Sequence, residues 1–202
     1  MCSTLTTVLN AIDQANAQDP KLDRDDNDQD IPEALLYGVR MSNELDRLFG
    51  DAVSDVLKIA CRGQHIERWK LLRADYPEGR AGYLTWRRDQ GRAHGERLAG
   101  LMRDAGYDDH SCNRVGVLLR KEGLKRDPEV QMLEDTICMV FLKFYFAAFS
   151  QKHPFEKVVD IVAKTARKLS EGARNRVLLE FDLPEALENA VRSAPNPRST
   201  TQ

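Results

Sequence analysis

Two histidines and several carboxylates fall on or beside the apolar faces of different predicted helices. These residues are His65, His94, Glu122, Glu134 and Asp135. Imidazole nitrogens and carboxylate oxygens from separate helices form the mixed ligand set that zinc, iron and manganese accept. In helical bundles such sites are built from inward-facing side chains, and ligation removes the cost of burying an unpaired carboxylate. The set predicts a divalent transition metal (Zn, Mn or Fe) bound by His65, His94 and Asp135, with Glu122 or Glu134 as a further ligand or general base.

The same residues also have an ordinary structural interpretation. The two histidines can be hydrogen-bonded core residues, and each acid can pair with a nearby base. The candidate bases are Arg62, Arg68, Arg120 and Lys121. Taken singly, each residue favours this structural interpretation, because the spacing is not a sharp metal-binding signature such as HExxH. Only the set as a whole favours a metal site.

Arginine is dense around the first histidine and in the loop that follows it. The arginines are Arg62, Arg68, Arg73, Arg80, Arg87, Arg88 and Arg92, interleaved with Trp69, Tyr76, Tyr83 and Trp86. Arginine binds phosphates and carboxylates through paired hydrogen bonds. The region therefore predicts an anionic small-molecule substrate bound by Arg68, Arg73, Arg80, Arg87 and Lys121, or an RNA segment. The alternative is a solvated face paired with nearby acids.

The bulk composition limits the classes of function. The 202 residues are 42% hydrophobic and 31% charged, with a formal charge of -2, so we expect a well-packed protein and no wholesale binding of nucleic acid. The four cysteines lack metal-ligand spacing, and Cys61 and Cys138 predict buried, reduced thiols. No serine or cysteine has an obvious neighbouring base, which leaves covalent catalysis without support. The N-terminal residues resemble no export signal, so we expect a cytoplasmic protein that does not enter a membrane.

A central core helix is predicted from Gln131 to Phe149. From Ile137 onward this segment is apolar on every side except for Lys143. Such a helix is buried in protein or lipid, and this one is shorter than the roughly 20 residues that span a bilayer. Asp127 followed by proline is a typical helix start.

Helical spacing elsewhere predicts an all-α, single-domain bundle of seven to nine helices, with no strand pattern. One predicted helix is capped by Asp51 and places Leu57, Cys61, His65 and Trp69 on its inner face. A later one carries Glu122 on its apolar face and ends at Gly123. The other predicted helices cover residues 4–18, 32–50, 83–105, 154–169, 174–181 and 184–191. The expected organisation is an N-terminal helix (1–18), an acidic linker (19–31), a helical core domain (32–193) and a disordered tail (194–202).

Several blocks of the sequence resemble one uncharacterised protein family. The blocks are Gln64-His65-Ile-Glu-Arg68-Trp69, Tyr76-Pro77, Arg80-Ala-Gly-Tyr83-Leu-x-Trp86-Arg87, His94-x-Glu96, Leu118-Leu-Arg-Lys-Glu122, Asp127-Pro-Glu129-x-Gln131-x-Leu-Glu-Asp135 and Phe141-Leu-x-x-Tyr145-Phe146. They resemble the family catalogued as domain of unknown function 4202, over about Ala11 to Leu169. The resemblance brings no activity with it.

A more distant resemblance is to the HD-domain superfamily, α-helical metal enzymes that include nucleotide phosphohydrolases and some di-iron oxygenases. His65 looks like the central histidine of that superfamily, His94 like one of its later histidines, and Asp135 like its final aspartate. This resemblance implies an HD-like fold and a metal. Ile66 follows His65, so the His-Asp pair of the superfamily is absent, and Glu96, Glu122 or Glu134 would have to supply the missing oxygen.

Two functions follow for the chain. The first is a metal-dependent hydrolase acting on a phosphate-bearing small molecule or nucleotide, with an oxygenase as a variant. In it the metal activates water, and Arg68, Arg73 or Arg80 neutralises the substrate. The second is a non-catalytic module that binds RNA or protein through the Arg- and Trp-rich surface of residues 62–92. The two differ in whether the purified protein retains metal and whether its binding depends on salt.

Overall fold

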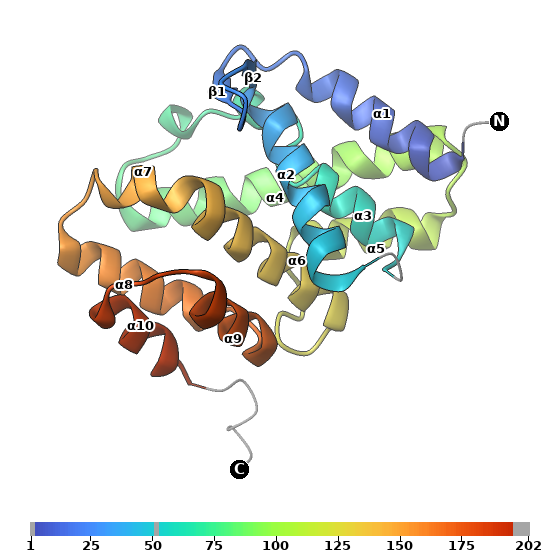
Figure 1. The fold of residues 1–202 in the computed structure, drawn as a ribbon. Helices are drawn as coiled ribbons and strands as arrows, with labels where there is room; N and C mark the ends of the chain where they lie inside the picture. The colour runs from blue at the N-terminus through green and yellow to red at the C-terminus, as the bar shows by residue number, and fades with distance from the viewer. Residues whose placement is uncertain (1–2, 51–52, 196–202) are drawn as a thin grey trace. The chain divides into compact units, whose positions relative to one another are not determined.

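The structure, a computed structural model, describes residues 3–50 and 53–195 (Figure 1). Over these residues the chain forms ten α-helices and two short strands, so the predicted all-α class is confirmed and the predicted helix number is too low. The chain divides into two compact units, Met1–Glu122 and Gly123–Gln202. The boundary falls inside the predicted core domain of residues 32–193. Each unit is described by itself.

The N-terminal unit contains five α-helices, a β-hairpin and two 3-10 turns among its described residues. The helices are α1 (Thr4–Asn16), α2 (Glu33–Phe49), α3 (Asp55–Arg62), α4 (Gly79–Asp104) and α5 (Asp109–Leu119), and the 3-10 turns cover Arg68–Lys70 and Arg73–Asp75. Side chains of Ser3, Ser54 and Asp108 accept hydrogen bonds from backbone N–H groups in the first turns of α1, α3 and α5. These caps explain where the three helices begin. Asp51, the expected cap of the third helix, lies outside the described residues.

The acidic segment of residues 19–31 forms a hairpin, so the expectation of a linker without strands is wrong. Strand β1 (Leu22–Arg24) pairs antiparallel with β2 (Asp30–Pro32). At the turn, Asp25 accepts hydrogen bonds from two backbone N–H groups. Arg40 of α2 donates to Asp23 Oδ2 at 3.0 Å and to the carbonyl of Arg24 at 2.9 Å. Arg40 of α2 therefore holds in place two strands whose sequences do not alternate between apolar and polar residues.

Helix α3 ends at Arg62, so the prediction that it continues through His65 and Trp69 is wrong. Gly63 packs against Leu98 so closely that a Cβ on it would lie 2.5 Å from that side chain. After a further turn, Glu67 adopts a left-handed backbone conformation with φ of 50°. The left-handed conformation of Glu67 is incompatible with an α-helix that continues through this segment. His65 therefore lies in a loop over residues 63–76 (hereafter the histidine loop).

The core of the N-terminal unit lies between its helices. Fully buried side chains come from every helix, and they include Ile12, Met41, Leu57, Leu98, Met102 and Leu118. Helices α4 and α5 approach closely where Gly95 meets Gly116, since a Cβ on Gly95 would lie 3.1 Å from the Cα of Gly116. Cys61 and Cys112 are buried and form no disulfide among the described residues, and the same holds for Cys138 in the C-terminal unit. The prediction of buried, reduced Cys61 and Cys138 is therefore confirmed.

The predicted core helix of the C-terminal unit is interrupted. It forms as α6 (Pro128–Val140), a π-helical turn (Phe141–Tyr145) and α7 (Phe146–Ser150). The side chain of Asp127 caps α6, as expected. Burial is nearly complete only through Leu142; Lys143 is exposed, and the aromatic residues that follow are half-buried. The prediction that this helix is buried as far as Phe149 is therefore wrong. In its second half, Phe141 packs edge-on against Phe146 and Phe149.

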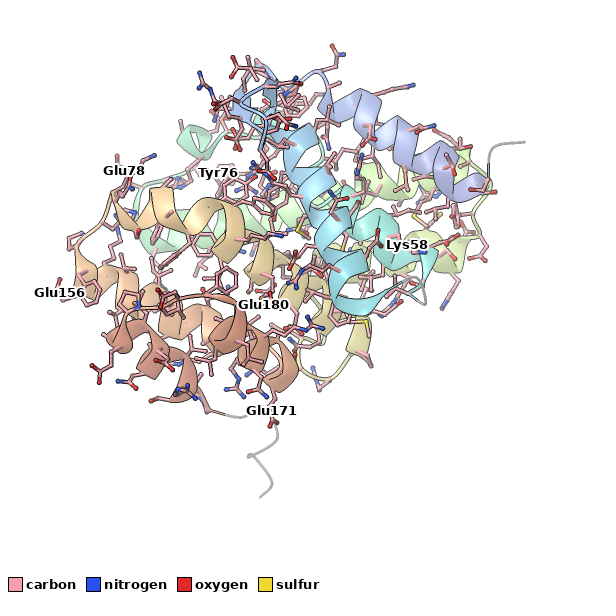
Figure 2. The ribbon with its side chains drawn as sticks, viewed as in Figure 1. Lys58, Tyr76, Glu78, Glu156, Glu171 and Glu180 are labelled. Carbon is pink, nitrogen blue, oxygen red and sulfur yellow. The ribbon has the colours of Figure 1, made fainter. Side chains whose placement is uncertain are left out.

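Three further helices complete the C-terminal unit as described. They are α8 (Phe155–Ala166), α9 (Glu171–Glu180) and α10 (Glu185–Arg192), and α8 and α10 pack together. Glu180, labelled in Figure 2, accepts a hydrogen bond from Arg176 one turn earlier in α9. The buried Arg174 donates to the carbonyl of Ala194. Most of the predicted tail, residues 196–202, lies outside the described part. No helix in the described residues is long and apolar enough to cross a membrane.

Candidate functional site

His65 and His94 meet in the N-terminal unit although they come from different elements. His65 lies in the histidine loop and His94 lies in the middle of α4. Their ring centroids are 6.4 Å apart, with an angle of 54° between the planes. The ring of Tyr37, from α2, stacks on His65 with centroids 3.8 Å apart and planes 14° apart. The loop, α2 and α4 therefore together position one pair of imidazoles.

Polar side chains on one face of α4 hold the histidine loop. Trp86, Gln90 and His94 are spaced by four residues and so share a face of the helix. Gln90 Nε2 donates to the carbonyls of Arg68 and Leu71 at 3.0 and 2.9 Å. Trp86 Nε1 donates to the same carbonyl of Leu71 at 3.0 Å. These bonds supply side-chain donors to two loop carbonyls, of which that of Arg68 also accepts from the backbone N–H of Leu71, and they fix the loop against α4.

A second set of contacts holds the loop at Glu67. The backbone N–H of Glu67 donates to Asn16 Oδ1 of α1 at 3.1 Å, and Asn16 Nδ2 donates to the carbonyl of Ala34. The carboxylate of Glu67 accepts from Lys70 at 2.8 Å and from Arg97 of α4 at 3.2 Å. Because Asn16 is buried, its amide links α1, α2 and the loop. Tyr76, labelled in Figure 2, donates to Asp89 at 3.2 Å and fixes the far end of the loop.

His94 has a buried ring nitrogen without a partner. The side chain is 4% exposed, and its Nε2 makes no hydrogen bond among the described residues. Burial, with the charge of Arg68, lowers the pKa of His94 to about 4, and a hydrogen bond to the backbone of Gln64 opposes this shift. Because Nε2 is unpaired, Nδ1 makes that bond, so Nδ1 carries the proton and Nε2 has a free lone pair. The side-chain Oε1 of Gln64 is also buried without a partner.

The pKa of His65 lies well below its ordinary value. Burial is the largest cause, followed by the charges of Arg68, His94, Lys121 and Arg87. Both imidazoles are therefore neutral at physiological pH. The charges of Arg68, Arg87 and Lys121 act on the His65 ring, and that of Arg68 also acts on His94. We name His65, His94, Arg68, Arg87 and Lys121 the histidine–arginine cluster.

The two arginines of the cluster lie over aromatic rings. The guanidinium carbon of Arg68 is 4.7 Å from the ring centroid of Trp86, and that of Arg87 is 5.9 Å from the centroid of Tyr83. Arg68 is half-buried and Arg87 is exposed. Neither forms an ion pair within the described part of the chain, although exposed arginines elsewhere do. Positive charge thus accumulates beside the histidines, and the negative charge of Glu33 acts on Arg68.

The other predicted residues of this unit have different surroundings. Arg73 donates to the carbonyl of Tyr76 at 2.9 Å within the loop, and Arg80 is exposed in the first turn of α4. Glu122 lies beyond the end of α5, is exposed and pairs with Arg120 at 2.7 Å, so the expectation that it extends an apolar helix face was wrong. Glu96 is exposed on α4.

Glu134 and Asp135 lie on α6 of the C-terminal unit, and both are buried. Asp135 Oδ1 accepts from Gln131 Nε2 at 2.9 Å and from the backbone N–H of Ser170 at 2.8 Å. Burial raises the pKa of Asp135, while the bonds from Ser170 and Gln131 act in the opposite direction. Glu134 Oε1 is 3.4 Å from Lys168 Nζ. Within this unit the two acids connect α6 to the segment between α8 and α9.

The predicted metal ligands are divided between the two units. His65 and His94 belong to the N-terminal unit, and Asp135 belongs to the C-terminal unit. Over residues 3–50 and 53–195, the structure holds no group of three or more His, Cys, Asp or Glu side chains placed to bind a metal ion. The shared site of His65, His94 and Asp135 stays a prediction.

Sequence reasoning missed two residues that define the cluster. Tyr37 was only one of several residues in a predicted helix, and nothing in its spacing indicated a stack on His65. Gln64 was noted only as a neighbour of the histidine. Gln90, in contrast, falls four residues before His94 in the predicted helix of residues 83–105, so a polar amide on the same helix face as His94 is the pattern that could have identified it.

Comparison with known proteins gives one match that covers most of the chain. The family model described as "Domain of unknown function (DUF4202)" matches residues 6–191. No curated protein and no solved structure matches the chain.

Proposed function

Since the chain belongs to the DUF4202 family, which is defined without an activity, we propose a function from its own residues: it binds and hydrolyses a phosphate-bearing small molecule at the histidine–arginine cluster. The proposal takes from the sequence the anionic ligand and the roles of Arg68, Arg87 and Lys121 in binding it. It gives the role of general base to His94.

One observation supports the proposal above all others. His94 presents a buried, unpaired Nε2 beside a second neutral imidazole and the charge of Arg68. Buried polar atoms are nearly always hydrogen-bonded, so an unpaired one needs an explanation such as a ligand. Arg68 is half-buried and without an ion pair among the described residues, and a half-buried cation is stabilised by an anion. Guanidinium groups bind phosphate oxygens in pairs, which makes phosphate the fitting anion.

The neutral state of the imidazoles fits a role in proton transfer. In hydrolysis a water oxygen forms a bond to phosphorus, the bond from phosphorus to the ester oxygen breaks, and the leaving oxygen gains a proton. His94 Nε2 accepts the proton of the attacking water, and the resulting imidazolium returns it to the leaving oxygen. Arg68, Arg87 and Lys121 stabilise the charge on the phosphoryl oxygens.

Calorimetric titration of inorganic phosphate and a phosphate monoester tests the binding step. The wild-type protein should bind both, and Arg68→Gln should weaken binding about tenfold or more, because a charged hydrogen bond contributes about 1.5–3 kcal/mol. Arg88→Gln is the matched control, since Arg88 lies on α4 next to Arg87 in the sequence and pairs with the adjacent Asp89. Equal affinity in both variants, or no binding by the wild type, contradicts the proposal.

A metal-dependent form of the same activity has support from His94. A metal-ligating histidine usually donates its other ring nitrogen to a carbonyl or carboxylate, and His94 uses the backbone of Gln64 in this way. The proposed ligands are His65, His94 and Asp135 with Zn, Mn or Fe, and Glu134 or Glu122 is the general base of this variant. Elemental analysis of the purified protein tests it.

Binding of RNA or of a protein through residues 62–92 is the less favoured function. Arg62 is held by Asp13 through two bonds of 2.6 and 2.7 Å, and Arg73 is held within its loop. These arginines are therefore engaged inside the protein. Salt-dependent RNA binding, linear on a log–log plot, would support this function over the small-molecule proposal.

A further inference from the structure

The histidine–arginine cluster holds two acceptor atoms that a phosphate group alone cannot satisfy. They are Nε2 of His94 and Oε1 of Gln64, both buried and both without a hydrogen-bond partner in the described residues. The two residues are neighbours, because the backbone of Gln64 bonds to the His94 ring. The phosphate oxygens of a fully ionised monoester are acceptors too, so they bind the cations but leave a lone pair facing a lone pair at these two atoms.

The charge around the acceptors limits the kind of donor. Arg68, Arg87 and Lys121 all act on the His65 ring, and Arg68 acts on His94 as well. An ammonium donor would be repelled by these three charges. A neutral donor is not repelled. A hydroxyl fits best, because its hydrogen donates to an acceptor while its oxygen accepts from a neighbouring guanidinium.

We propose that the ligand is a hydroxylated phosphate ester, a sugar or polyol phosphate, whose hydroxyl donates to His94 Nε2 or Gln64 Oε1 while its phosphate is held by Arg68, Arg87 and Lys121. This inference rests on the proposed phosphate-binding function and adds the class of the substrate to it. The free sugar phosphate and the ribonucleotide share this chemistry.

Such a site discriminates strongly against a ligand without the hydroxyl. An analogue without the hydroxyl displaces water from the two buried acceptors and leaves them without a hydrogen bond, which weakens its binding. Inorganic phosphate keeps a P–OH donor near neutral pH, so we expect it to bind at least as tightly as methyl phosphate, whose ionised phosphate group has none. Glycerol 3-phosphate should bind about ten- to a hundredfold more tightly than methyl phosphate, which corresponds to one buried hydrogen bond.

The test is a calorimetric series on the full chain. The ligands are inorganic phosphate, methyl phosphate, glycerol 3-phosphate, ribose 5-phosphate and AMP. Tighter binding of the last three than of methyl phosphate supports the proposal, and the comparison of ribose 5-phosphate with AMP decides between the free sugar phosphate and the nucleotide. Gln64→Leu should reduce the advantage of the hydroxylated ligands over methyl phosphate. Gln14→Leu, on the exposed face of α1, is the control.

Two failures are distinguishable. If neither inorganic phosphate nor methyl phosphate binds, the proposed function is wrong, and this inference is wrong with it. If methyl phosphate binds as tightly as glycerol 3-phosphate in the wild type, phosphate binding stands and the hydroxyl inference alone is overturned, since water then satisfies the two acceptors. The wild-type series gives this answer even if Gln64→Leu does not fold.

Discussion

His65 and His94 form a pair with ring centroids 6.4 Å apart, one from a loop and the other from the middle of a helix. Neither ring is fixed by its own element alone. Tyr37 stacks on His65, and the backbone of Gln64 bonds to His94. The geometry of the pair therefore depends on the histidine loop being held in place, and most of the predictions below concern this loop or the neutral state of the rings.

The neutral histidines should make the N-terminal unit sensitive to acid. The pKa of His94 is about 4 in the folded protein and near 6.5 when exposed. When folding lowers the pKa of a histidine, the contribution of that histidine to stability is fully present at pH values above its unfolded-state pKa. This stability is lost as pH falls from about 6.5 to about 4. The difference corresponds to about 3 kcal/mol for His94. His65 acts in the same direction.

Urea unfolding at several pH values, followed by tryptophan fluorescence, measures this effect. Both tryptophans, Trp69 and Trp86, lie in the N-terminal unit. The free energy of unfolding should fall between pH 7 and pH 5 in the wild type, and the slope should be smaller in His94→Gln. His110→Gln, at an exposed position, should keep the wild-type slope. A flat wild-type profile contradicts the neutral, buried state of His94.

Gln90→Glu should release the histidine loop from α4. The glutamate keeps the size of the side chain but cannot donate to the carbonyls of Arg68 and Leu71 when ionised. Both carbonyls keep another donor, the backbone N–H of Leu71 for Arg68 and Trp86 Nε1 for Leu71, so the cost comes from a buried carboxylate that faces two carbonyl oxygens without a proton to donate. Hydrogen exchange should become faster across residues 64–76, and phosphate affinity should fall. Glu96→Gln, at an exposed position of the same helix, should change neither, and unchanged exchange in Gln90→Glu would show that the loop is held by other contacts.

Asp135→Asn separates a structural role of this acid from a role as a metal ligand. The asparagine oxygen can still accept from Gln131 and Ser170. Because burial raises the pKa of Asp135, its ionised form is costly in the folded state at neutral pH, and a neutral amide removes that cost. We expect a melting temperature at pH 7 equal to or above that of the wild type. Loss of bound metal or of activity with an unchanged melting temperature would instead indicate a role as a ligand.

The metal-dependent variant has its own test in elemental analysis. It predicts close to one transition-metal ion per chain in the purified protein, and loss of that metal in His65→Ala and in His94→Ala. His110→Ala is the control, because His110 is exposed. Metal-free wild-type protein that still hydrolyses a phosphate ester would exclude this variant and leave the imidazole mechanism.

Helix positions could largely be predicted from the sequence, because caps and apolar spacing are local. Asp127 followed by proline marks a helix start that the sequence predicts and that the structure has. The errors came from contacts distant in sequence. Gly63 ends α3 because Leu98 lies against it, and the hairpin of residues 22–32 forms beside Arg40. Neither contact leaves a local pattern.

The candidate site could be predicted only in part, for the same reason. His65 and His94 were expected on helix faces, and only His94 lies on one. The prediction placed the two histidines together because both side chains were assumed to point from helices into the core. In the structure, the histidine loop and the stack with Tyr37 place His65 next to His94. The importance of Gln64 depends on one unpaired oxygen, which no residue spacing can indicate.

The state of the His94 imidazole nitrogens tests the central claim most directly. Nitrogen-15 NMR of the imidazoles should show Nδ1 protonated and Nε2 unprotonated in the free protein at neutral pH. Titration with glycerol 3-phosphate should shift the Nε2 resonances of His94 and His65 saturably and leave His110 unchanged. If the resonances of His94 and His65 do not respond while the protein remains folded, the histidine–arginine cluster is not a phosphate-binding site.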